Sequence, residues 1–390
     1  MSVTAAQGFT AAGIAAGIKA NGNPDLALVV NNGPRLAAAG VFTSNRVKAA
    51  PVHWSEQVMR GGNVGAVVLN SGGANACTGP RGFQDTHATA ERAAAVLNGL
   101  ELGTEHNAGE IAVASTGLIG VLLPMDKLLP GIETAAAALS AEGGEAAAIA
   151  IKTTDTVHKT ATVTRDGWTV GGMAKGAGML APGLATMLVV LTTDADLDAG
   201  TLDKALRDAT RTTFDRVDSD GCMSTNDTVL LLASGASGLV PEFEDFAQAV
   251  RTVCGDLARQ LIGDAEGASK EIRIEVVGAA SEEDAVEVGR SIARNNLLKC
   301  AIHGEDPNWG RVLSAIGTTK AAFDPDRLDV AINGIWVCRN GSVGEDRDLV
   351  SMKDREVRIT ADLRAGSESA VIWANDLTAE YVHENSAYAS

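Results

Sequence analysis

Short apolar runs alternate along the chain with longer segments in which Ala and Leu recur at helical spacing. Apolar runs bounded by turn residues are typical of buried β-strands, and the sequence predicts strands at 26–31, 65–70, 111–115, 187–192, 271–277, 328–335, 357–363 and 369–374. Apolar positions three or four residues apart predict helices at 84–97, 125–139, 198–214, 245–262 and 282–295. Strands interleaved with helices predict an α/β fold with sheets layered against helices.

The distribution of charge marks the clearest division of the chain, which shows no fixed-period repeat and no linker-like segment. Residues 1–185 carry 12 Lys and Arg against 13 Asp and Glu, whereas residues 186–390 carry 20 against 36. The length of 390 residues suits one large or two medium domains. The sequence by itself therefore draws only one boundary, near residue 186.

Composition excludes several classes of protein. The net charge is −17 and aromatic residues make up 4%, which argues against a nucleic-acid partner because phosphate contacts require an excess of Lys and Arg. No window approaches 18 apolar residues without a charge, so no membrane span is expected. The N-terminal residues lack a charged segment ahead of an apolar stretch, so no signal peptide is predicted.

The cysteines and histidines favour neither a disulfide scaffold nor a metal site. The five cysteines are odd in number, lie far apart and form no CxxC pair, which indicates reduced thiols and a cytoplasmic location. The six histidines show no spacing typical of metal ligands, so we expect no metal. Cys77 is a weak candidate nucleophile, because no His lies in an obviously partnering motif.

A glycine-rich segment with one lysine precedes a predicted strand at 175–188, KGAGMLAPGLATML. Glycines allow a ligand to approach the backbone closely, and Lys175 is suited to hold a carboxylate. The spacing matches neither a Walker loop nor a Rossmann fingerprint. The plain alternative is a loop that leads into a core strand.

Thr186 follows this flexible turn and directly precedes the strand, which suggests self-cleavage. Its hydroxyl can attack the carbonyl of Ala185, and hydrolysis of the resulting ester would leave Thr186 as a new N-terminus. A free α-amine has a pKa of about 7.7–8.0 in model peptides. It can therefore act as the base for the neighbouring hydroxyl, as in N-terminal threonine nucleophiles.

Two further loops contain hydroxyls and glycines that suit a ligand. The loop at 115–120, STGLIG, follows a predicted strand, and its backbone N–H groups and the Thr116 hydroxyl can stabilise an oxyanion. The loop at 70–79, NSGGANACTG, is either a ligand loop or a glycine-rich turn. An ordinary turn between two elements is the alternative for both.

Taken in order, these segments resemble the ornithine acetyltransferase (glutamate N-acetyltransferase) family of arginine biosynthesis. The resemblance covers nearly the whole chain and rests on the segments NSGGANACTG at 70–79, STGLIG at 115–120, TTDT at 153–156, KGAGM at 175–179, ATML at 185–188, STNDT at 224–228, DAEG at 264–267, DPNWGR at 306–311 and ENSAY at 384–388. Each segment is weak alone, and their shared order makes the resemblance specific.

The resemblance implies roles for individual residues. It makes Thr186 the nucleophile and Ala185–Thr186 the self-cleavage site, and it makes Thr116 and Gly117 the oxyanion-hole pair. The substrate-contacting positions that it implies are Thr153, Lys175, Thr186, Glu266, Asn385 and Ser390. An α-carboxylate suits Lys175 and a side-chain ammonium suits Glu266. The alternatives are that Lys175 and Glu266 are surface charges and that Asn385 and Ser390 lie in a frayed tail.

The activity implied by the resemblance is acetyl transfer from N2-acetyl-L-ornithine to L-glutamate by a ping-pong mechanism without a cofactor. The α chain, residues 1–185, and the β chain, residues 186–390, would form one globular unit, and the family implies an α2β2 heterotetramer. Whether acetyl-CoA is a second donor, which would make a multifunctional enzyme, stays open at this point. Two other interpretations are a self-cleaved threonine aminopeptidase or amidase, and an acidic binding protein that keeps an intact chain.

Overall fold

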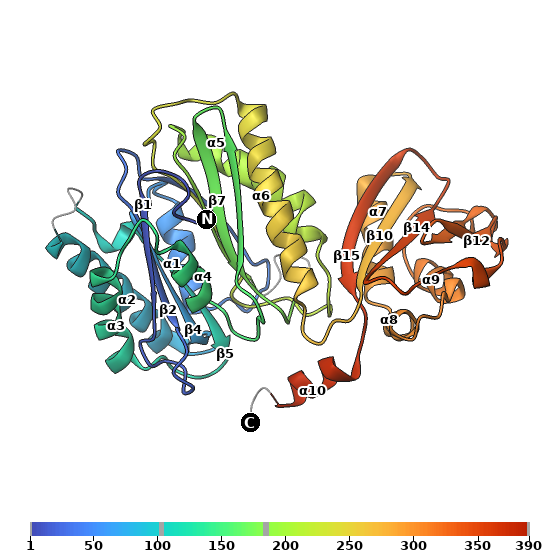
Figure 1. Ribbon diagram of the computed structural model, residues 1–390, viewed down its shortest axis with the longest axis horizontal. Coiled ribbons are helices and arrows are strands. Elements are labelled where there is room, and N and C mark those ends of the chain that lie inside the picture. The colour runs from blue at the N-terminus through green and yellow to red at the C-terminus, as the bar shows by residue number, and fades with distance from the viewer. Residues whose placement is uncertain (1, 101–104, 182–186, 388–390) are drawn as a thin grey trace. The chain divides into compact units, whose positions relative to one another are not determined.

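The computed structural model describes residues 2–100, 105–181 and 187–387 (Figure 1). The chain divides into two compact units. Unit 1 comprises Met1–Ala177, Gly183–Asp215 and Met223–Leu261, and unit 2 comprises Gly178–Pro182, Arg216–Cys222 and Ile262–Ser390. Both units therefore take residues from each side of the predicted cleavage point. The α/β class predicted from the sequence is confirmed.

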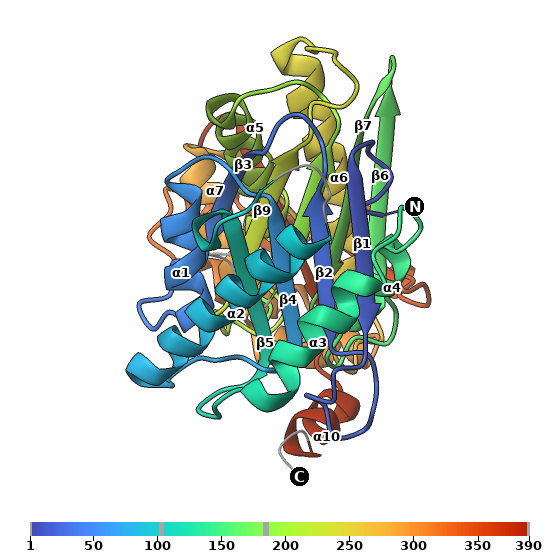
Figure 2. The ribbon, with the colours of Figure 1, turned by 90° about the vertical axis from the view of Figure 1, so that its left-hand side faces the viewer.

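Unit 1 contains a four-stranded sheet in the order β1-β2-β4-β5. Its strands are β1 (Phe9–Ile14), β2 (Leu26–Asn31), β4 (Ala66–Gly73) and β5 (Ile111–Leu118). Every residue of β2 is buried, which requires cover on both faces of the sheet. The helices α2 (Gly79–Gly99) and α3 (Met125–Ala137) supply it on one face, as Figure 2 shows.

A five-stranded sheet in the order β3-β9-β8-β7-β6 covers the other face. Its strands are β3 (Ala37–Phe42), β9 (Thr228–Ala233), β8 (Leu188–Thr193), β7 (Trp168–Lys175) and β6 (Lys159–Arg165). Leu69 and Val67 of the first sheet share one apolar core with Val190 and Leu230 of the second. The two sheets thus form the inner layers of unit 1.

Helices complete the outer layer of unit 1 and its edges. The helix α5 (Ala199–Thr212) contacts β3 and β9, and α6 (Phe243–Gly263) places Val253 and Leu257 against β7. The helices α1 (Ala50–Met59) and α4 (Gly144–Ala150) each contact strands of both sheets. Asp198 caps the N-terminus of α5 by accepting a hydrogen bond from Thr201 N at 2.8 Å.

Unit 2 is built on a six-stranded sheet in the order β13-β12-β11-β14-β10-β15. Its strands are β10 (Glu271–Ala279), β11 (Asp329–Ile332), β12 (Ile335–Arg339), β13 (Ser342–Val343), β14 (Glu356–Asp362) and β15 (Glu368–Asn375). Its helices are α7 (Glu282–Ala293), α8 (Asn296–His303), α9 (Trp309–Ile316) and α10 (Ala379–Ala387). Buried and half-buried residues alternate along β10 because α7 covers only one face of this sheet.

One predicted strand is wrong in its extent. The segment 328–335 contains β11 and only the first residue of β12, because Asn333 and Gly334 both have positive φ and reverse the chain between these two antiparallel strands. None of the helices in the described residues combines the length and the apolar character needed to cross a membrane.

Candidate active site

The carboxyl ends of β4 and β5 bring two of the predicted glycine-rich segments together. The strands run parallel, with Asn70 paired to Ser115 and Ser71 paired to Thr116. Gly117 has a φ of 128°, and a Cβ atom there would lie 2.6 Å from the carbonyl carbon of Gly72. Only glycine fits this position, because a side chain would collide with backbone that cannot move away.

Lys175 is the last residue of β7 and is buried, with 2% of its surface exposed. The structure therefore corrects the expectation of a loop lysine and excludes a surface charge. Its Nζ donates to Thr153 Oγ1 at 2.7 Å and to Thr116 Oγ1 at 3.3 Å. Because an ammonium can only donate, the Thr116 hydroxyl accepts this bond, and its own hydrogen is directed to another acceptor.

Asp155 supplies the negative charge beside this lysine, although the sequence did not single it out. It accepts hydrogen bonds from Lys159 Nζ at 2.7 Å and from Gly176 N at 2.6 Å. Burial alone would raise the pKa of Asp155, but the charges of Lys175 and Lys159 and the Gly176 N–H outweigh it. The pKa of this carboxyl consequently lies well below its usual range.

The start of β8 lies next to Lys175 in the second sheet. Leu188 pairs with Lys175 on one side and with Thr228 of β9 on the other. Met187 N donates to Asp227 Oδ1 at 3.0 Å, so the residue that follows Thr186 is fixed by a buried side chain. Ala185 and Thr186 themselves lie outside the described residues.

In unit 2, two of the predicted substrate-contacting residues come together. Asn385 Nδ2, on α10, donates to Glu266 Oε2 at 2.8 Å. A Cβ atom on Gly178 would lie 2.3 Å from that same oxygen, so the glycine leaves room for the carboxylate. Burial and the negative charges of Asp220 and Glu266 raise the pKa of Tyr381, also on α10, to about 12. Ser390 lies outside the described residues.

The structure thus places the predicted residues in two groups. Thr116, Gly117, Thr153 and Lys175 meet in unit 1, and Glu266 meets Asn385 in unit 2. Two site residues that the sequence did not single out, Asp155 and Asp227, lie within segments that carried the family resemblance, TTDT and STNDT. Their membership of those segments was the available signal.

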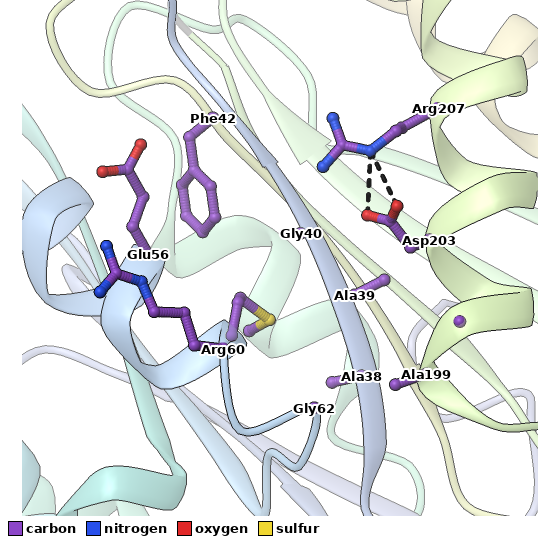
Figure 3. A pocket seen from close by; sticks show the side chains of 12 residues that line it. Ala38, Ala39, Gly40, Phe42, Glu56, Arg60, Gly62, Ala199, Asp203 and Arg207 are labelled. Atoms are coloured by element: carbon purple, nitrogen blue, oxygen red, sulfur yellow. Dashed lines mark hydrogen bonds and ion pairs between the residues drawn. The ribbon is translucent and has the colours of Figure 1, made fainter.

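A hollow elsewhere in unit 1 has a different lining. It has a volume of about 600 Å³ and lies among β3, α1 and α5 (Figure 3). None of the sequence-predicted site residues lines it. Two of its carboxylates already have cationic partners, since Asp203 binds Arg207 and Glu56 binds Lys48. We therefore place the candidate site at the strand ends and not in this hollow.

Cys77 is exposed in a left-handed backbone conformation, with a φ of 57°. Within residues 2–100, 105–181 and 187–387, no three His, Cys, Asp or Glu side chains gather as metal ligands.

A directed hydroxyl, glycine N–H groups and a buried ammonium at neighbouring strand ends suit an enzyme of acyl transfer. Comparison with known proteins agrees with this class. The ArgJ family model matches residues 10–390. The arginine biosynthesis bifunctional protein ArgJ of Streptomyces avermitilis is 81% identical over the whole of both chains, and that of Thermobifida fusca is 62% identical over the whole of both. The chain belongs to the ArgJ family.

A solved structure of a relative covers part of the chain. Ornithine acetyltransferase from Mycobacterium tuberculosis, complexed with ornithine, is 60% identical over 48% of this chain and 96% of its own, with a TM-score of 0.46. Family membership confirms the family predicted from the sequence, and with it an acyltransferase of arginine biosynthesis.

Proposed function

We propose that this chain transfers the acetyl group of N2-acetyl-L-ornithine to L-glutamate through an acetyl ester on Thr186. Membership of the ArgJ family supports the reaction class. The observation that carries the residue assignments is the contact of buried Lys175 with Thr116 and Thr153, one strand away from the start of β8. The binding-protein alternative instead predicts an intact chain of 390 residues.

The first step of the proposal is self-cleavage of the Ala185–Thr186 bond. The Thr186 hydroxyl attacks the Ala185 carbonyl, the C–N bond breaks, and the nitrogen takes a proton as the chain becomes an ester. Water then hydrolyses this ester, which restores the hydroxyl and leaves residues 1–185 and 186–390 as separate α and β chains. The anchoring of Met187 by Asp227 supports this step, because it fixes the residue adjoining the nucleophile.

Acetyl transfer then uses the new N-terminus. The α-amine of Thr186 accepts the hydroxyl proton while Oγ attacks the acetyl carbonyl. Thr116 and Gly117 hold the developing oxyanion, and the bond from Lys175 directs the Thr116 hydroxyl hydrogen toward it. Ornithine leaves with that proton. The amine of glutamate then attacks the acetyl ester, the bond from the acetyl carbon to Thr186 Oγ breaks, and the proton lost by the glutamate amine passes through the Thr186 α-amine to Oγ, which restores the hydroxyl. No metal or organic cofactor takes part in the proposed reaction.

Substrate recognition is assigned to Thr153, Lys175, Glu266, Asn385 and Ser390. The ammonium of Lys175 matches the α-carboxylate that ornithine and glutamate share. The half-buried carboxylate of Glu266, held by Asn385, matches the side-chain ammonium that only ornithine carries.

The same proposal includes an α2β2 assembly in the cytoplasm, without nucleic-acid or membrane partners. The name of the relatives, a bifunctional protein, supports a second activity, for which acetyl-CoA is the proposed donor. The aminopeptidase or amidase alternative predicts that water discharges the acyl-enzyme, so release of the acetyl group would not depend on glutamate.

Separate measurement of the two half-reactions tests the recognition roles. We expect Glu266→Gln to slow formation of the acetyl-enzyme from N2-acetyl-L-ornithine more than its discharge to glutamate, because glutamate lacks the side-chain cation. Lys175→Met should slow both halves. Glu380→Gln removes a charge from the exposed face of α10 and is the matched control. Equal losses in both halves for Glu266→Gln would refute its role as the reader of the ammonium.

A further inference from the structure

The segment 224–227, which we call the positioning segment, has entered the proposal so far only through Asp227, which anchors Met187 for self-cleavage. It lies just before β9, and all four of its residues are buried. Thr43 Oγ1 donates to Ser224 O at 2.7 Å, Ala49 N donates to Thr225 O at 2.9 Å, and Thr43 N donates to Asp227 O at 3.0 Å. These bonds hold the backbone of the segment in one conformation.

Asn226 connects the positioning segment to the predicted oxyanion donors. Its Nδ2 donates to Ser115 O at 2.8 Å and to Ala74 O at 2.6 Å. Its Oδ1 accepts from Thr225 Oγ1 at 2.6 Å, which fixes the orientation of the amide. The first of these carbonyls belongs to the residue before Thr116. The second lies just beyond the Gly72–Gly73 backbone that contacts Gly117.

Asp227 connects the same segment to the residue after the nucleophile. Its Oδ1 accepts from Met187 N, and Thr228 N donates to Met187 O at 3.1 Å. Met187 is therefore held on both its N–H and its carbonyl. Burial raises the pKa of Asp227 well above its usual range, although the Met187 N–H and the Ser224 hydroxyl act to lower it. A raised pKa favours the uncharged form of the carboxyl, whose carbonyl oxygen still accepts the bond from Met187 N.

We propose that Asn226 and Asp227 are positioning residues for acetyl transfer, which hold the oxyanion donors and the nucleophile on one rigid segment. This inference rests on the proposed roles of Thr186, Thr116 and Gly117. Two strand ends from different sheets must meet within a fraction of an ångström for the reaction to proceed. Adjacent side chains set this distance because each reaches one of the two sheets.

The first test compares Asn226→Ala with Asn31→Ala. Asn31 is equally buried, and its Nδ2 also donates to two carbonyls, Arg35 O at 3.0 Å and Ala233 O at 3.1 Å. Ala233 ends β9, about 20 Å along the chain from the positioning segment. Both variants lose the same kind of interaction, so both should lower the melting temperature to a similar degree.

The two variants should differ in catalysis. We expect Asn226→Ala to lower kcat about 10- to 100-fold with KM changed less than about 3-fold. Asn31→Ala should keep kcat within about 2-fold of the unsubstituted enzyme. Each kcat is calculated per cleaved chain, with the cleaved fraction measured by intact mass. If Asn226→Ala does not fold, Asn226→Ser takes its place. Equal kcat values for the Asn226 and Asn31 variants would overturn the proposal.

Combination with Thr116→Ala shows whether Asn226 acts through the oxyanion donors. If it does, Asn226→Ala should lower kcat less than about 3-fold in the Thr116→Ala background, because the hydroxyl donor that Asn226 orients is already absent. A full, multiplicative loss in the double variant would contradict this. If Thr186→Ala retained activity, the proposed function would fail whatever the outcome for Asn226.

The pair Asp227→Asn and Asp227→Ala tests the second contact. Asparagine keeps an oxygen that can accept from Met187 N and carries no charge, so its kcat should stay within about 3-fold of the unsubstituted enzyme. Alanine removes the acceptor and should lower kcat by at least about 10-fold. Equal losses of kcat in both variants would contradict the role of Asp227 in holding Met187, and would show that catalysis depends on the carboxyl proton instead.

Discussion

Asp155 is the residue at which burial and charge compete most directly in unit 1. Its carboxylate is fully enclosed, yet it stays ionised because two lysines and a backbone N–H face it. An isolated buried ammonium would be expected to lose its proton. The carboxylate thus supplies a counter-charge for the Lys175 ammonium, which donates to Thr116 and Thr153.

Asp155→Asn should destabilise unit 1 and remove most of the activity. The substitution leaves two buried ammonium groups without their counter-charge, which typically costs about 3–5 kcal/mol. Denaturant unfolding at pH 7 measures the loss. In the unsubstituted protein the pKa of Asp155 is lower in the native state than in the unfolded chain. The stabilisation that the ionised carboxylate provides is therefore present above about pH 4 and is lost as the pH falls further. An unchanged unfolding midpoint for Asp155→Asn would refute the role of Asp155 as the counter-charge of the two lysines.

The sequence could predict single site residues only where local pattern or resemblance marked them. Thr116 and Gly117 stand in a strand-to-loop segment, and Lys175 stands in a glycine-rich one, so both segments drew attention. Asp155 could not be assigned in this way, because its role depends on lysines that approach it only after folding. The burial of Lys175 was also out of reach, since a lone lysine beside glycines is typical of an exposed loop.

At the scale of elements, the strongly apolar strands were predictable and the glycine- and alanine-rich ones were not. The predictions for β2 and β4 hold because each contains a continuous run of large apolar residues. The strands β1 and β7 contain small residues where another backbone approaches. A Cβ on Gly13 would lie 1.9 Å from Ala146 O, and one on Gly171 would lie 2.3 Å from Ser2 O. Close packing against another backbone thus explains why these strands contain glycines, which weaken the apolar pattern that predicts a strand.

Gly117→Ala tests whether the close pairing of β4 and β5 positions the oxyanion donors. The added Cβ would force the two strand ends apart, because it meets backbone atoms of Gly72 and Gly73 at 2.6 Å. We expect kcat to fall on the order of 10²–10³-fold, the usual effect of losing an oxyanion donor.

Gly120→Ala is the matched control for this substitution. Gly120 also has a positive φ, of 83°, but nothing lies within 4 Å of its Cβ position. It should therefore show the backbone strain without the collision and keep kcat within about 3-fold of the unsubstituted enzyme. Similar kcat values for the two alanine variants would mean that the spacing of the strand ends does not control the reaction.

At the scale of the whole molecule, the excess of negative charge falls on the residues after position 185. Of the net charge of −17, residues 1–185 contribute one negative charge, so nearly all of it follows the proposed cleavage point. Each compact unit nevertheless draws on both sides of that point. The sequence showed the charge boundary, but it could not show this division into units, because the short segments that cross between them carry no compositional signal.

A buried carboxyl in unit 2 makes the stability of the protein depend on pH. Burial raises the pKa of Asp218 to about 6, although Arg294 opposes the shift from 2.7 Å. The native state therefore holds this proton more tightly than the unfolded chain, where the pKa is about 3.9. The stabilisation of the native state by protonated Asp218 is fully present below about pH 4 and is lost as the pH rises through 6.

Asp218→Asn should remove this dependence. The difference in unfolding free energy between Asp218→Asn and the unsubstituted protein should shift in favour of the variant by about 2 kcal/mol between about pH 4 and pH 7. Asp329→Asn should show almost no shift over this range, because a carboxyl with a lowered native pKa loses its stabilisation only below about pH 4. The Asn340 N–H, Arg339 and Arg364 hold the pKa of Asp329 below its usual range against the effect of burial. Parallel curves for Asp218→Asn and the unsubstituted protein would contradict the assignment.

The intact mass of the denatured protein, taken after incubation with N2-acetyl-L-ornithine and without glutamate, tests the central claim most directly. The account predicts two chains, residues 1–185 and residues 186–390, with one added acetyl group on the second chain only. Glutamate should remove that group, and Thr186→Ala should give a single uncut chain that never gains it. An uncut 390-residue chain that still transfers acetyl groups, or an acetyl group on residues 1–185, would contradict the account.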